Sequence, residues 1–128
     1  MREATQEIFL YPDEGGISPL WGADYRIDMT AIGLSNSLQR RLAKWAEEFL
    51  ADTGRRFEPG WPEGPGAEEW DEEGRRLQRK LALLWGRRFV VVRFDRFGAE
   101  SRMQSENLGT DAEALRALGA LIASYRAT

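Results

Sequence analysis

The sequence contains neither histidine nor cysteine among its 128 residues. Without histidine, the chain lacks the side chain that most often acts as a general base near neutral pH and most often binds transition metals. Without cysteine, it has no disulfide, no thiolate nucleophile and no cysteine ligand for zinc or iron–sulfur clusters. Carboxylates, lysine, arginine, tyrosine and hydroxyl groups remain. We therefore expect a protein that acts by binding rather than by catalysis, without a cofactor or metal.

Long apolar runs and a strong net charge are also missing. The longest apolar runs, Leu81–Trp85 and Phe89–Val92, fall far short of the roughly 20 residues that a membrane span needs. The polar N-terminal segment has no apolar signal-peptide core, so we expect a cytoplasmic protein without membrane association. A net charge of −3 gives no basic excess that would attract nucleic acid. Length and a 42% apolar content predict one globular domain over residues 1–128.

Strand-like segments flank a helical middle. Residues 5–11 and 88–97 predict strands, the second a central one because its core is apolar on both faces. Residues 17–21 predict an edge strand or a packed loop, residues 22–33 a weakly extended segment, and residues 101–105 a weaker strand.

Three amphipathic helices are predicted from apolar spacing. The first follows Ser35 as N-cap, the second covers residues 68–85 and ends at Gly86, and the third begins with a capping box of Thr110 and Glu113. The expected buried stripes are Leu38, Leu42, Trp45 and Phe49; Trp70, Gly74, Leu77, Leu81 and Leu84; and Leu115, Leu118, Ile122 and Tyr125. This order predicts an α+β fold with three main helices on a small, mostly antiparallel sheet; a three-layer α/β arrangement is the alternative.

The second helix is dense in charge. Its acidic start, residues 68–73, complements the helix dipole, and Asp71/Arg75 and Glu72/Arg76 are expected to pair. Neighbouring carboxylates on a helix point around the axis, so we favour a solvated helix start over a cation site. Gly74 on the apolar stripe indicates close packing against another element.

Aromatic residues in a loop rich in glycine and proline, residues 54–67, are the most interesting candidates for partner binding. Exposed aromatic side chains dominate the energetics of protein interfaces, so Phe57 and Trp61 are candidate contacts. The alternative is that Trp61 folds back over the core. For Trp21 the same two possibilities apply, a partner contact or packing in the core. The predicted partner-binding set is Phe57, Trp61, Trp21, Arg75, Arg76 and Arg79.

Two other functions stay open. A small enzyme that uses carboxylates and arginine would need residues such as Asp13, Asp24 and Asp28 to converge in a pocket. A nucleic-acid binder would use the basic residues of segment 75–96, namely Arg75, Arg76, Arg79, Arg88 and Arg93. Acidic residues directly upstream favour intramolecular ion pairs over nucleic-acid binding. The glycine-rich segments match neither a phosphate-binding loop nor a dinucleotide fingerprint.

Several segments resemble a family of small uncharacterised bacterial proteins. They are YPDEGGISPLW, LSNSL with RLAKWAEEF, and EGRRLQRKL before RFVVVRF. The resemblance covers residues 8–94 and implies a common fold and a bacterial origin, but it brings no known activity and no catalytic residues. The segment 98–128 has no counterpart in it.

The leading hypothesis is a non-enzymatic, protein-binding module of the immunity or antitoxin type, which masks a partner protein. No catalytic motif fills the place of the missing histidine and cysteine, and acidic binders often block basic active sites through complementary charge. The identity of the partner and the oligomeric state are left open by the sequence.

Overall fold

The computed structural model describes residues 6–12, 18–23, 25–53 and 66–126. The elements in chain order are β1 (Gln6–Leu10), β2 (Leu20–Trp21), the 3-10 helix η1 (Met29–Ile32), α1 (Asn36–Thr53), α2 (Ala67–Trp85), the 3-10 helix η2 (Gly86–Arg88), β3 (Phe89–Phe94), β4 (Glu100–Met103) and α3 (Ala112–Arg126).

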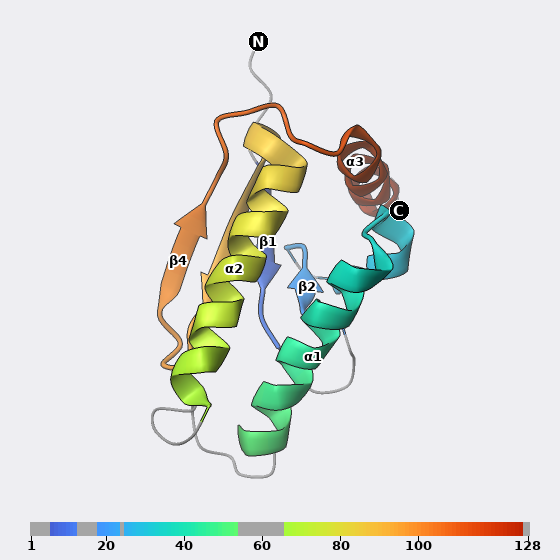
Figure 1. The fold of residues 1–128 in the computed structure, drawn as a ribbon. Helices are drawn as coiled ribbons and strands as arrows, with labels where there is room; N and C mark the ends of the chain where they lie inside the picture. The colour runs from blue at the N-terminus through green and yellow to red at the C-terminus, as the bar shows by residue number, and fades with distance from the viewer. Residues whose placement is uncertain (1–5, 13–17, 24, 54–65, 127–128) are drawn as a thin grey trace.

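The four strands form one mixed sheet in the order β2-β1-β3-β4 (Figure 1). The central pair, β1 and β3, is parallel, whereas β2 joins β1 and β4 joins β3 in antiparallel fashion. The connection between the parallel strands passes through α1 and α2, as a parallel pairing requires. The α+β prediction is confirmed, and β3 is a central strand as expected.

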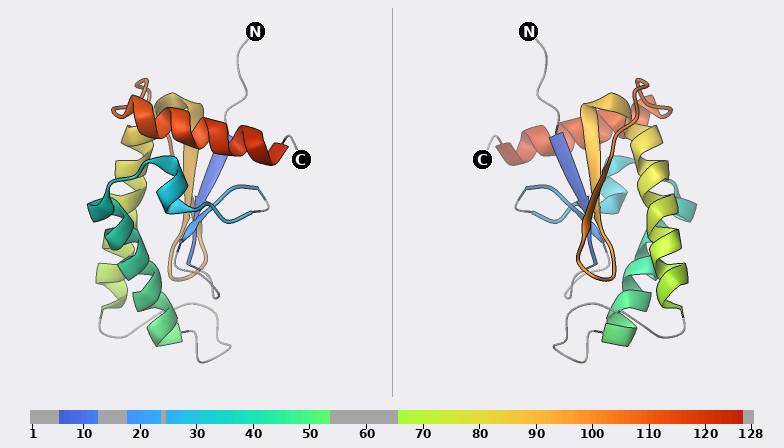
Figure 2. Two further views of the ribbon diagram at one scale, coloured as in Figure 1. Left: turned by 90° about the vertical axis from the view of Figure 1, so that its right-hand side faces the viewer. Right: turned by 90° about the vertical axis from the view of Figure 1, so that its left-hand side faces the viewer.

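The helices pack mainly on one face of this sheet. Figure 2 shows α1 and α2 together on one side, while α3 crosses one end of the sheet. No helix among the described residues covers the opposite face, so the three-layer alternative is wrong. Between sheet and helices lies the core, whose largest fully buried side chains include Trp45, Trp70, Trp85 and Phe89.

The boundaries of α1 and α2 follow their predicted signals. The Ser35 hydroxyl accepts a hydrogen bond from the Leu38 backbone N–H at 3.1 Å, which confirms the N-cap. Gly86 ends α2 with a φ of 72°, a conformation that disfavours other residues. A Cβ at Gly86 would lie 2.4 Å from the backbone of Leu108 and Gly109, so only glycine allows the loop before α3 to close against the end of α2.

The start and the buried stripe of α3 differ from expectation. Its cap is Asp111 and not Thr110, because the Asp111 carboxylate accepts from the Ala114 N–H at 3.1 Å. Ala114, Leu118 and Ile122 are buried. They lie four residues apart, so they share one face of the helix. The predicted burial of Tyr125 is wrong: its side chain is 42% exposed, although its ring stacks on Tyr25.

Residues 22–33 are only partly extended. Arg26 forms an isolated bridge with Trp21, but Met29–Ile32 is the 3-10 helix η1. The Asp28 carboxylate caps η1 by accepting from the Thr30 backbone N–H at 2.9 Å. This local side-chain contact competes with strand pairing, which explains why the prediction of extended chain is wrong here.

Candidate functional site

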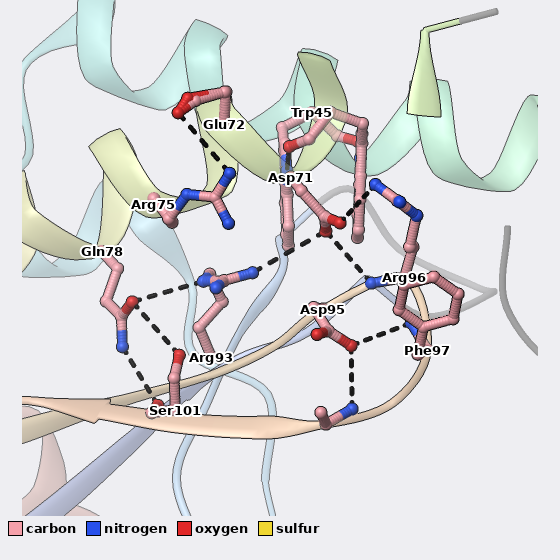
Figure 3. Close-up of polar contacts among 12 residues, drawn as sticks. Trp45, Asp71, Glu72, Arg75, Gln78, Arg93, Asp95, Arg96, Phe97 and Ser101 are labelled. Carbon is pink, nitrogen blue, oxygen red and sulfur yellow. Dashed lines mark hydrogen bonds and ion pairs between the residues drawn. The ribbon is translucent and has the colours of Figure 1, made fainter. Parts of the chain in front are cut away.

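A buried carboxylate organises the region where α2 meets the turn between β3 and β4. Asp71, in the first turns of α2, is 5% exposed. It accepts hydrogen bonds from Arg96, at 2.8 Å from the side-chain Nη1 and at 3.1 Å from the backbone N–H (Figure 3). The guanidinium of Arg93 lies 3.8 Å away on its other side. One carboxylate therefore balances two arginines and holds the turn against the helix.

Gln78 extends this network along the helix. Its Oε1 accepts from Arg93 Nε at 3.3 Å, while its Nε2 donates to the backbone carbonyls of Val91 at 2.9 Å and Ser101 at 3.1 Å. Burial lowers the pKa of Arg93, and the charge of Asp71 counteracts that effect. An arginine stays charged at physiological pH in spite of such a shift. The network thus ties α2 to two strands and has the character of a structural ion cluster.

The turn after β3 is closed by Asp95. The Asp95 carboxylate accepts from the backbone N–H groups of Phe97 at 2.8 Å and Ala99 at 2.9 Å, and its carbonyl accepts from Gly98 at 2.9 Å. Phe97 itself is 63% exposed. The guanidinium carbon of Arg96 lies 4.6 Å from the centre of the Phe97 ring. The segment Asp95–Ala99, which we call the Phe97 turn, therefore presents an exposed phenyl ring on a well-bonded backbone.

Two contacts fix α1 against the part of α2 that carries Asp71. The rings of Trp45 and Trp70 stack at 4.5 Å, and each indole N–H donates to the other residue's backbone carbonyl, at 3.0 and 2.7 Å. Arg41 forms a two-pronged contact with Glu73, at 3.0 and 3.1 Å, which raises the pKa of that arginine. Bidentate pairs of this kind set the geometry of the two groups.

Of the predicted partner-binding residues, the structure describes Trp21 on β2 and Arg75, Arg76 and Arg79 on α2. Phe57 and Trp61 lie outside the described residues. Trp21 is half-buried in β2, where its indole N–H donates to the Tyr11 carbonyl at 2.9 Å and the Arg26 guanidinium lies over its ring. Trp21 thus already serves to hold the edge of the sheet together.

The predicted arginines of α2 are exposed, but their ion pairs differ from expectation. Arg75 pairs with Glu72 at 3.5 Å and Arg76 with Glu73 at 3.6 Å, each three residues apart. The predicted pairs of Asp71 with Arg75 and Glu72 with Arg76 are wrong, because Asp71 faces the sheet. Arg79 is exposed and has no ion pair within the described part of the chain.

The structure argues against two of the residues that were predicted for an enzyme or a nucleic-acid binder. Arg93 is 5% exposed, so its prediction as a surface contact for nucleic acid is wrong. Asp13 and Asp24 lie outside the described residues. Hydrogen bonds from the Thr30 side chain and backbone lower the pKa of Asp28, whereas a general acid requires a raised pKa. Within the described ranges, no group of three or more acidic residues is placed to hold a metal ion.

Apolar spacing within single elements did not predict the Asp71 network, although the sequence contains a signal for it. The buried positions of α2 include 67, 70, 71, 74, 77, 78, 81, 82 and 85, a helical stripe that contains Asp71 and Gln78. On β3, Arg93 continues the alternation of Phe89 and Val91 toward the helices. Polar residues that fall on two apolar stripes facing each other indicate a buried network.

Comparison with known proteins identifies a family for this chain. A family model described as Serratia CdiI immunity protein-like matches residues 6–96, from β1 to the Phe97 turn. The chain belongs to this family. Membership supports an immunity-type, protein-binding role, and families of this kind are generally non-enzymatic. No curated protein and no solved structure matches the chain. None of the described helices is both long and apolar enough to cross a bilayer.

Proposed function

We propose that this protein is an immunity protein that binds a protein toxin, masks its active site and performs no catalysis of its own. The observation that carries the proposal is the family match over residues 6–96. The arrangement of charged groups agrees with it, because the buried carboxylate of Asp71 is engaged by two arginines and a backbone N–H and is not available to a substrate. Trp21, Arg75, Arg76, Arg79, Phe57 and Trp61 stay predictions as contacts of that toxin.

The test uses a candidate toxin domain, sought in the product of the gene immediately upstream of the one that encodes this chain. Cells that produce this domain should stop growing, and co-production of the full immunity chain should restore growth. A Leu118→Asp variant is the control, because Leu118 is 0% exposed in the core and a buried charge there should unfold the protein. With purified proteins, the wild-type chain and the domain should form a stable complex. Absence of both protection and binding would contradict the proposal.

A further inference from the structure

We propose that the Phe97 turn and the adjacent acidic start of α2 form the surface that contacts the toxin. The corresponding toxin surface is basic and surrounds an apolar pocket for the Phe97 ring. This inference rests on the immunity function proposed above and adds the location and the chemistry of the contact.

Phe97 is an exposed aromatic residue. Its side chain is 63% exposed, while most large apolar residues of the described chain are buried. An aromatic ring at the tip of a turn can enter a pocket and bury a large apolar area, and a few such anchors carry most of the binding energy of an interface. The exposed ring also has an arginine against it, Arg96, the charged residue most enriched in such interfaces.

The turn is held by hydrogen bonds before any partner binds. The Asp95 carboxylate fixes the backbone of Phe97 and Ala99, and the Asp71 carboxylate fixes both the backbone and the side chain of Arg96 (Figure 3). Binding then costs little ordering entropy. A buried ion pair gives little net stability over an apolar replacement, so its use here agrees with a positioning role.

Acidic residues lie at the start of α2, beside the turn. Glu68 and Glu69 begin α2, within one turn of Asp71, and both are exposed without an ion pair in the described part of the chain. Asp95 adds a third carboxylate that is bonded to backbone N–H groups. A basic partner surface complements these charges, which would accelerate association and favour the correct partner.

The other end of α2 is the competing surface. It presents the exposed residues Arg79, Lys80 and Arg87 together with Leu83, 42% exposed, and Leu108, 69% exposed. The loop that carries Leu108 lies against this end, because Arg87 N–H donates to the Asn107 carbonyl at 2.8 Å. Leucine is under-represented among the residues that dominate binding, whereas aromatic residues are enriched among them. The Phe97 end is therefore the better candidate.

The experiment compares matched variants in binding to the purified toxin domain. Phe97→Ala should weaken the Kd at least tenfold, whereas Leu108→Ala, which removes an even more exposed side chain at the opposite end of α2, should stay within threefold of wild type. Glu68→Gln with Glu69→Gln should weaken binding severalfold, mainly through the association rate. Lys80→Gln with Arg87→Gln, a pair outside the predicted contact residues, should not weaken it. Urea midpoints equal to wild type show that each variant is folded.

The outcomes separate this inference from the proposed function. If the wild-type chain does not bind the toxin domain, the immunity function fails and this inference fails with it. If the wild-type chain binds but Phe97→Ala stays within threefold of it, the function stands and the inference is overturned. Weakened binding by Leu108→Ala or by the Lys80 and Arg87 pair, with Phe97→Ala unaffected, would also overturn it and place the contact at the basic end.

Discussion

At Gly74, α2 lies close to both α1 and the sheet. A Cβ added there would lie 3.1 Å from Nε1 of Trp45 and 3.2 Å from Cδ of Arg93. Trp45 cannot move aside easily, because its ring stacks on Trp70 and its N–H is hydrogen-bonded. The close packing predicted from the position of this glycine on an apolar stripe is confirmed.

We therefore expect Gly74→Ala to lower the free energy of unfolding by about 1 kcal/mol, since overpacking costs about 1–3 kcal/mol and exceeds the helix-propensity gain of about 1 kcal/mol. Gly119→Ala in α3 is the matched control, because a Cβ there meets nothing within 4 Å. It should raise stability by about 0.5–1 kcal/mol. Urea denaturation measures both, and equal stabilisation by the two changes would contradict the close approach at Gly74.

Asp71 is the second residue with a defined expectation. Asp71→Asn removes the countercharge of Arg93 and Arg96, and a buried charge left without its partner costs about 3–5 kcal/mol. Glu72→Gln breaks only an exposed pair with Arg75 and should cost less than about 1 kcal/mol. Chemical denaturation of both variants decides the matter: a cost for Asp71→Asn as small as that of the control would argue against a buried cluster.

At the scale of elements, the helices and the central strand were predictable, and the edges of the sheet were less so. Ser35 and Gly86 mark helix ends through local chemistry that the sequence displays directly. The cap of α3 was misassigned by one residue because Thr110 and Asp111 are both good caps, and the tertiary contact of the Thr110 N–H with the Leu83 carbonyl decides between them. The Asp71 network depends on contacts between α2 and β3, which spacing within one element does not reveal.

The packing of α1 on α2 is expected to depend on the Trp45–Trp70 pair as a unit. Trp45→Phe and Trp70→Phe each remove an indole N–H donor and part of a stacked ring, so each should cost about 1–3 kcal/mol. Because the two rings contact each other, the double variant should cost less than the sum by about 0.5 kcal/mol or more. A double-mutant cycle in urea measures this coupling, and strictly additive losses would show that the two tryptophans act independently.

For the whole molecule, the distribution of charge over the surface matters more for partner binding than the net charge of −3. Among the described residues, carboxylates without an ion pair lie at the start of α2 and cationic groups without one lie near its end. The six predicted contact residues could not reveal this polarity, because the sequence does not show which charges are neutralised by neighbours.

The proposed charge complementarity predicts that the rate of association with the toxin depends on salt concentration. If the acidic end meets a basic toxin surface, the association rate should fall about tenfold or more between 50 mM and 500 mM NaCl, while the dissociation rate changes little, because salt screens the approach of separated charges. Stopped-flow fluorescence gives both rates. An association rate that does not depend on salt, or that rises with it, would speak against the charge complementarity.

The most direct measurement of the central claim is a photo-crosslink from the turn itself. Phe97 is replaced by benzoylphenylalanine, Leu108 is replaced in the same way as the matched control, and each variant is irradiated together with the purified toxin domain. Both positions are exposed, at 63% and 69%, so both variants should fold. The account predicts a covalent product with the toxin domain from position 97 and none from position 108. A product from position 108 without one from position 97 would contradict it.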